Sequence, residues 1–215
     1  FADFGAETVT SAVDLILDGA ERQARAAVLT WPNGVYEGEA TLDDDGFGRE
    51  DIKIRAKVTV AGETVEIDMT NSDAESRGFV NSSHANTQSA IAMAFSFLLD
   101  PATPKNSGTI RPLTVKLKRG TMVWPNEGLP VTMCTSHCGN EIIEAVITAL
   151  SAATPERAMG GWGRRLRLAI QGVDPRNGQK FIWHMFHARP GAGGSINGDG
   201  WHCSGEGHSA GGLKF

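Results

Sequence analysis

The spacing of apolar residues predicts three main helices along the chain. Apolar side chains recur at helical intervals across residues 9–29, and a second apolar run, residues 89–99, ends just before Pro101. A third run covers residues 141–153 and stops near Pro155. Each run is long enough for several turns, and proline does not continue a helix, so we interpret all three as helices that turn an apolar side to the core.

Strict alternation of apolar and polar positions predicts strands between and after these helices. Residues 52–60 and 64–69 alternate on either side of a glycine-containing turn, which indicates a β-hairpin. The lysines and arginines on one face of this hairpin are interpreted as a solvated face. Further strands are expected at residues 35–42, 110–117, 166–171 and 180–186. The predicted fold class is α+β, with antiparallel and mixed β-sheets packed by the three helices.

Composition supports a globular protein with a sizeable core. The 215 residues are 40% hydrophobic, and their net charge of −5 argues against general nucleic-acid binding, which needs a basic face. No apolar stretch approaches the ~20 residues of a bilayer span, and no secretory signal pattern is visible, so we expect a cytoplasmic protein with no membrane partner. The core is expected to draw on Val13, Leu17, Ile54, Val58, Ile91, Phe95, Val115, Ile142, Val146, Leu150, Leu168 and Ile182.

The densest group of reactive side chains lies at residues 132–141, directly before the third predicted helix. It contains two thiols, an imidazole, hydroxyls, an amide and a carboxylate. A helix N-terminus offers unpaired N–H groups and a positive dipole end, which lower a thiol pKa. Cys134 or Cys138 could therefore be a nucleophile with His137 as its base. The structural alternative is that a small residue was needed before the helix and that His137 only caps or hydrogen-bonds locally.

Metal and phosphate sites are weaker interpretations of other segments. Zinc accepts cysteine and histidine, but the three cysteines and the later histidines lack paired ligand spacing, and we predict no metal held wholly within this chain. Residues 43–46, Asp-Asp-Asp-Gly, are typical of a turn and lack the distal glutamate of a calcium loop. Residues 191–212 are rich in glycine but lack a phosphate-binding motif, which favours a loop that allows close approach of a backbone or ligand. The later candidates are His184, His187, His202, Cys203 and His208.

A series of short motifs runs along the chain in a definite order. Their sequences are Pro-Asn-Gly-Val-Tyr at 32–36, Leu-Asp-Asp-Asp-Gly at 42–46, Asp-Met-Thr-Asn-Ser at 68–72, Asn81, Pro-Lys-Asn-Ser-Gly at 104–108 with Arg111 and Pro112, Gly120 and Thr121 with Pro130, Ala149 and Leu150 with Pro155, Glu156 and Ala158, residues 172–178, and Asp199 with Gly200. In this order they resemble the hydantoinase B/oxoprolinase family across residues 33–212. Asn71 departs from the pattern, since glycine is usual there.

The resemblance implies an enzyme that works with a partner. The family includes ATP-dependent hydantoin and lactam hydrolases, 5-oxoprolinases, and ketone carboxylases of the acetone and acetophenone types. In it, an A-type subunit handles ATP and Mg and phosphorylates the substrate carbonyl oxygen, and the B-type part completes the chemistry. This chain thus resembles the B-type catalytic portion of an ATP-dependent cyclic amide hydrolase in a hetero-oligomer. The alternatives are a subunit of an ATP- and bicarbonate-dependent ketone carboxylase and a non-catalytic assembly segment.

Within such an enzyme the catalytic candidates are His137 as general base, Glu141 as the group that orients it, and Cys134 or Cys138 as nucleophile. In the carboxylase branch, the ligands of a divalent metal precede the region that matches Phe1, so the resemblance implies a metal outside residues 1–215. The chain is accordingly expected to be a single segment of a B-type subunit, truncated at both ends. The candidate substrate contacts are Asn81, His84, Asn106 and Asp199.

Overall fold

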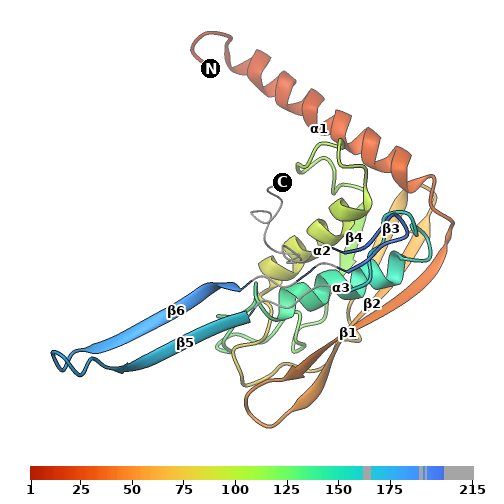
Figure 1. Ribbon diagram of the computed structural model, residues 1–215. Helices are drawn as coiled ribbons and strands as arrows, with labels where there is room; N and C mark the ends of the chain where they lie inside the picture. The colour runs from red at the N-terminus through yellow and green to blue at the C-terminus, as the bar shows by residue number, and fades with distance from the viewer. Residues whose placement is uncertain (162–165, 189–190, 192, 201–215) are drawn as a thin grey trace.

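The computed structural model of the protein describes residues 1–161, 166–188, 191 and 193–200, with only the backbone for 166–169 and 184–188. This part of the chain holds three helices and six strands, so the predicted α+β class is confirmed. In chain order they are α1 (Ala6–Val28), β1 (Gly34–Asp44), β2 (Glu50–Ala61), β3 (Thr64–Asp68), α2 (His84–Leu98), β4 (Leu113–Lys116), α3 (Cys138–Leu150), β5 (Leu166–Val173) and β6 (Lys180–Ala188) (Figure 1).

The main sheet is mixed and has the strand order β1-β2-β3-β4. The first three strands pair antiparallel, with Val58 opposite both Tyr36 and Ile67, whereas β4 runs parallel to β3 and places Val115 opposite Ile67. A parallel pair needs a crossover connection, and α2 lies within the one between β3 and β4. Strands β5 and β6 form a separate two-stranded hairpin that projects from the body (Figure 1).

Helix α3 is the centre of the packing. It contacts β1 and β2 on one side and α2 on the other, and eleven of its thirteen residues are buried. This position covers α3 on two sides, which buries its apolar residues although the helix also carries polar ones. The approach to the sheet is close at Gly38, where a Cβ atom would lie 2.1 Å from the carbonyl oxygen of Ala145. Glycine at position 38 therefore lets the helix backbone rest directly on β1.

Most of the expected core is confirmed, including the three positions on one face of α3. Val13 and Ile182 were wrongly placed in the core, since they are 48% and 66% exposed. Leu17 and Val115 are half-buried, and the side chain of Leu168 lies outside the described residues. The buried positions are Ile54, Val58, Ile91, Phe95, Ile142, Val146 and Leu150.

The error at Val13 has a simple cause in the position of α1. Only Ala20, Ala24 and Val28 of this helix are buried, and its first half extends beyond the body (Figure 1). An amphipathic pattern shows which side of a helix is apolar, but it does not show whether anything covers that side. None of the helices in the described ranges combines the length and apolarity needed to cross a membrane.

Candidate functional site

The loop that precedes α3 lies against the beginning of α2. Ser83 caps α2, because its hydroxyl accepts a hydrogen bond from the backbone N–H of Asn86 (3.2 Å). The side-chain amide of Asn86 donates to the carbonyl oxygen of Cys134 (3.1 Å) and to Ser82 Oγ (2.8 Å). The two polar segments that precede predicted helices are therefore neighbours in space.

Asn81 connects these two segments through hydrogen bonds of its side chain. Its side chain is fully buried, and its Oδ1 accepts from the backbone N–H of Ser76 (2.8 Å). Its Nδ2 donates to the carbonyl oxygens of Ser76, Gly78 and Pro130, at 2.9, 3.1 and 3.1 Å. Asn81 was predicted to contact the substrate. In the structure its side chain makes its hydrogen bonds within the protein and exposes no atom to a ligand.

Cys138 is the first residue of α3, and its thiol points into the core. It is fully buried, and its Sγ donates to the carbonyl oxygen of Met122 at 3.7 Å. Burial, and then the nearby Glu141 carboxylate, raise the pKa of the Cys138 thiol well above its ordinary value. The low pKa expected of a nucleophile at this helix terminus is thus wrong for Cys138, because its thiol is buried. Cys134 is half-buried in the preceding loop.

His137 and Glu141 line a common cavity of about 320 Å³, which we call the α3 cavity. It lies between the N-terminus of α3 and the turn that joins β1 to β2. Sequence reasoning found the histidine and the glutamate but not Ser136, nor the part played by the acidic turn. The other lining residues are Thr41, Leu42, Asp43, Asp44, Asp45, Gly46, Phe79, Val80 and Ser136.

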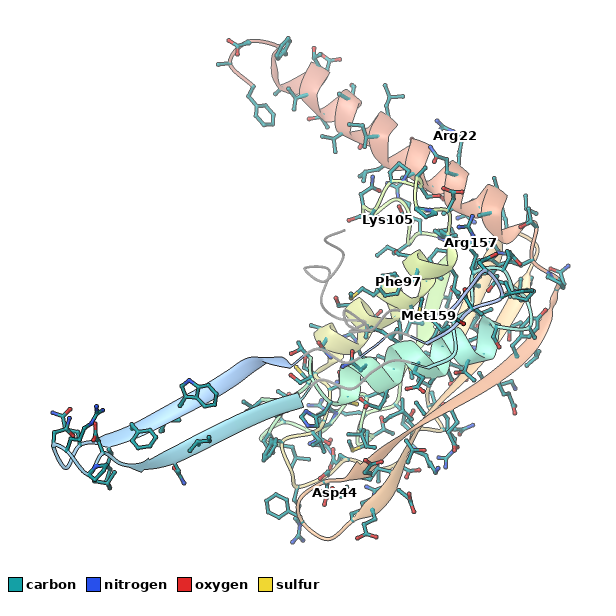
Figure 2. All side chains as sticks on the ribbon, viewed as in Figure 1. Arg22, Asp44, Phe97, Lys105, Arg157 and Met159 are labelled. Carbon is teal, nitrogen blue, oxygen red and sulfur yellow. The ribbon has the colours of Figure 1, made fainter. Side chains whose placement is uncertain are left out.

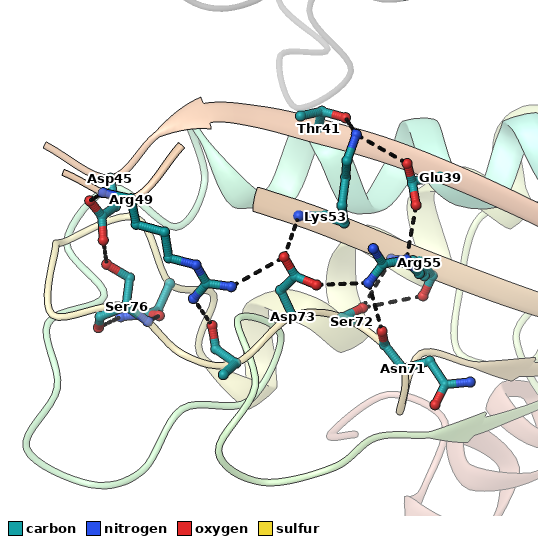
Figure 3. A network of polar contacts seen from close by, with 12 residues as sticks. Glu39, Thr41, Asp45, Arg49, Lys53, Arg55, Asn71, Ser72, Asp73 and Ser76 are labelled. Carbon is teal, nitrogen blue, oxygen red and sulfur yellow. Dashed lines mark hydrogen bonds and ion pairs between the residues drawn. The ribbon is translucent and has the colours of Figure 1, made fainter. Parts of the chain in front are cut away.

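The acidic turn is held in place by hydrogen bonds to Asp45. Its Oδ2 accepts from Ser76 Oγ (2.6 Å) (Figure 3). Its Oδ1 accepts from the backbone N–H groups of Phe47 (2.8 Å) and Arg49 (3.2 Å). The Ser76 hydrogen bond, more than the backbone ones, lowers the pKa of the Asp45 carboxyl. Asp44, at the end of β1, accepts from the backbone N–H of Gly46 and remains exposed (Figure 2).

Two members of the basic row on the outer face of the sheet, Lys53 and Arg55, are paired with carboxylates. Arg55 lies between Glu39 (2.9 Å) and Asp73 (2.7 Å), and Lys53 also contacts Glu39 (3.2 Å) (Figure 3). Arg49 contacts the second oxygen of Asp73 at 3.1 Å. Charges paired in this way leave little net positive field for an anionic ligand.

The other predicted contacts are dispersed. His84 begins α2 and its ring lies 4.6 Å from that of Trp124. Asn106 lies in the loop after α2, where its Oδ1 accepts from the backbone N–H of Gly108 (2.8 Å). Asp199 is exposed in a segment that hydrogen-bonds to residues 156–160, beyond the C-terminal end of α3. None of these three residues is among those that line the α3 cavity.

Within the described ranges, no three His, Cys, Asp or Glu side chains gather in a way that could hold a metal ion. We assign no metal ligand in this part of the chain. Cys203, His202 and His208 lie outside the described residues, as do the side chains of His184 and His187.

Comparison with known proteins identifies the family of this chain. The family model of hydantoinase B/oxoprolinase matches residues 1–213. The chain belongs to the hydantoinase B/oxoprolinase family. Two curated relatives agree: the beta subunit of the caprolactamase of Pseudomonas jessenii is 31% identical over 94% of this chain, and the B component of a provisionally named D-/L-hydantoinase of Pseudomonas sp. (strain NS671) is 28% identical over 81%. The chain spans about a third of each relative's length, 35% and 31%.

Solved structures of two proteins share the fold of this hydantoinase B/oxoprolinase chain. The ATP-dependent caprolactamase from Pseudomonas jessenii superposes with a TM-score of 0.84 at 30% identity, over 95% of this chain and 36% of that one. The nucleotide-free acetone carboxylase has a TM-score of 0.72 at 18% identity, over 88% of this chain and 28% of that one. At that lower identity the second likeness concerns the fold alone.

Proposed function

We propose that this chain is part of the B-type component of an ATP-dependent cyclic amide hydrolase. The observation that carries the proposal is the similarity to an ATP-dependent caprolactamase across 95% of the chain. Both curated relatives are named as one subunit of an enzyme, which supports a complex with an A-type subunit. That partner would bind ATP and Mg, and any divalent metal would bind outside this segment.

The chemical logic is that an unstrained amide resists attack by water. Phosphorylation of its carbonyl oxygen by the partner provides the driving force that the ring lacks. The B-type part then has to deliver water and manage protons. A general base contributes ~100-fold or more to such a step.

The α3 cavity offers the groups for this role. His137 is the proposed general base, and Glu141, one helical turn later, is the proposed orienting group, since both side chains line the cavity. The burial of Cys138 favours water over that thiol as the nucleophile. Cys134 remains a candidate nucleophile, and His84, Asn106 and Asp199 remain predicted substrate contacts.

A product assay on the full-length protein with its A-type partner tests this function. The mixture contains ATP and a panel of hydantoins, 5-oxoproline, larger lactams and simple ketones, with and without bicarbonate. Ring-opened acids formed without bicarbonate support the hydrolase. A β-keto acid formed only with bicarbonate would instead assign the protein to the ketone carboxylases, and no product from the panel would favour an assembly role.

The role of His137 has its own test in the same complex. His137→Ala should reduce turnover by about 100-fold, whereas Thr132→Ala, an exposed residue of the same loop, should change it little. A loss of less than about threefold in His137→Ala would remove it as the base.

A further inference from the structure

The first half of α1 exposes an apolar stripe. The second half of this helix buries the side that carries Ala20 and Ala24. At intervals of three and four residues the same side continues toward the N-terminus, where the exposed fractions of Val13 and Ile16 are 48% and 61%. A short helix in water is only marginally stable unless one side of it is packed. The free half of α1, residues 6–18, therefore requires a surface that covers this stripe.

The β5–β6 hairpin exposes an apolar face of its own. Ile170 lies opposite Trp183, and Phe181 lies opposite Gly172, so the three large side chains share one face. Their exposed fractions are 45%, 48% and 44%, respectively, for Ile170, Trp183 and Phe181. A two-stranded hairpin is barely stable alone in water and needs further strands or a helix against it. These three residues, which we call the aromatic face, therefore also require a covering layer.

The two elements carry charges of opposite sign. The free half of α1 contains no basic residue and three acidic ones, Glu7, Asp14 and Asp18. The hairpin contains one acidic residue, Asp174, and three basic ones, Arg167, Arg176 and Lys180. Two of these charges, on Asp18 and Arg176, are already paired within the chain. The remaining charges favour contact of the helix with the hairpin over contact of two helices or two hairpins.

The two elements lie apart within one copy of the chain. In Figure 1, α1 extends from the upper end of the body and the hairpin from its lower end, both toward the same side. Their lengths match, because residues 6–18 span about 20 Å of helix and the eight residues of β5 span about 26 Å of strand. A two-fold axis between two copies can therefore bring each hairpin to the free half of α1 of the other copy, and the contact forms twice.

We propose that the aromatic face of the hairpin packs on the apolar stripe of α1 of a second copy, and that the protein forms a two-fold dimer through two such contacts. The contact places a helix against a two-stranded sheet, which is the layer that each element requires. Trp183 lies at the centre of the proposed contact, and tryptophan is among the residues that contribute most to interface affinity. This interaction surface goes beyond the proposed hydrolase function and does not depend on it.

The mass of the full-length protein, measured by sedimentation without the A-type partner, tests the dimer. The protein should dimerise with a Kd on the order of micromolar. Ile16→Ser and Trp183→Ser should each raise this Kd about tenfold or more, because each removes a large apolar side chain from the contact. The matched control is Ile196→Ser, which removes an exposed isoleucine outside both elements and should leave the Kd unchanged. All three side chains are exposed, so circular dichroism should show an intact fold in each variant.

Cross-linking between copies tests which elements meet. In a full-length background with Cys134→Ser and Cys203→Ser, protein carrying Val13→Cys is mixed with protein carrying Ile170→Cys and treated with a short bismaleimide. A cross-linked dimer should form in the mixture at least about tenfold more than in either variant alone, since the contact joins a helix to a hairpin.

Three results would overturn the proposal. One is a full-length protein that stays monomeric well above micromolar concentration, which would mean that another part of the subunit or the A-type partner covers these elements. The second is a dimer whose Kd is unchanged in both Ile16→Ser and Trp183→Ser. The third is cross-linking that is as efficient in either cysteine variant alone as in the mixture, which would indicate contact between two helices or two hairpins.

Discussion

Ser76 Oγ donates a 2.6 Å hydrogen bond to Asp45 Oδ2, and this contact joins the loop before α2 to the turn after β1. Both residues are buried, and Ser76 Oγ also accepts from the backbone N–H of Gly78 (2.8 Å). The hydroxyl thus holds two loops at one edge of the α3 cavity, so the shape of the cavity depends on it.

Removal of the Ser76 hydroxyl should loosen this edge. Ser76→Ala is expected to reduce the free energy of unfolding by about 1–2 kcal/mol, because it deletes a hydrogen bond to a charged group. Urea unfolding of the full-length protein measures the change. Ser107→Ala, in an exposed loop, serves as the control and should change stability by less than about 0.5 kcal/mol.

The Asp45 carboxylate should make stability depend on acid pH. Its folded pKa lies below that of the unfolded chain, about 3.9, so its contribution is present above that value and is lost as pH falls through the folded pKa. Asp45→Asn should therefore show a smaller loss of stability than wild type between about pH 5 and pH 2. Equal losses in the two proteins, measured by urea unfolding, would contradict this.

Gly38 should tolerate no side chain. Gly38→Ala places a Cβ atom 2.1 Å from the Ala145 carbonyl oxygen and 2.5 Å from the Ala149 nitrogen, so α3 must move. We expect a destabilisation of about 3 kcal/mol or more, measured by chemical unfolding. Gly19→Ala is the matched control, since its added methyl has room within α1 and should stabilise the helix by about 0.5–1 kcal/mol.

Asn81 should prove structural by its effect on stability. Asn81→Ala removes four hydrogen bonds of a buried amide and should cost about 2–4 kcal/mol. Asn71→Ala, an exposed amide, should cost little. Thermal unfolding measures both. If Asn81→Ala kept wild-type stability but lost turnover, the residue would belong to the substrate site after all.

The two described thiols should differ sharply in reactivity. Cys134 is half-buried, whereas Cys138 is fully buried with a raised pKa. Iodoacetamide should therefore label Cys134 at least about tenfold faster in the native protein, as peptide mass spectrometry would show. Comparable rates after unfolding serve as the control. Faster labelling of Cys138 would restore it as a nucleophile.

Local sequence patterns were sufficient to predict the helices and strands, but not to predict which parts of the chain pack against them. The alternation at residues 52–60 and the apolar run before Pro155 predicted β2 and α3 to within a few residues, because period and proline are local signals. The pattern placed Cys138 near a helix start, but it could not show that the thiol faces the core. That direction depends on Met122, which belongs to a different segment.

The candidate site was predicted only in part, for the same reason. The sequence indicated His137 and Glu141 because reactive groups cluster there. It gave no sign that the acidic turn at 43–46 lies opposite them, since that approach depends on Asp45 and Ser76, which are far apart in the chain. Ser136 was missed because a buried hydroxyl without a partner is recognisable only in three dimensions.

The contact between Gly38 and α3 also bears on how the protein is made. The β1–β2 hairpin leaves the ribosome before α3, the helix that covers its apolar face, because α3 lies about 80 residues further along the chain. A nascent chain halted before Cys138 would present a bare apolar sheet to solvent, a surface prone to aggregation. Chaperone binding to the growing polypeptide should consequently fall once α3 has emerged.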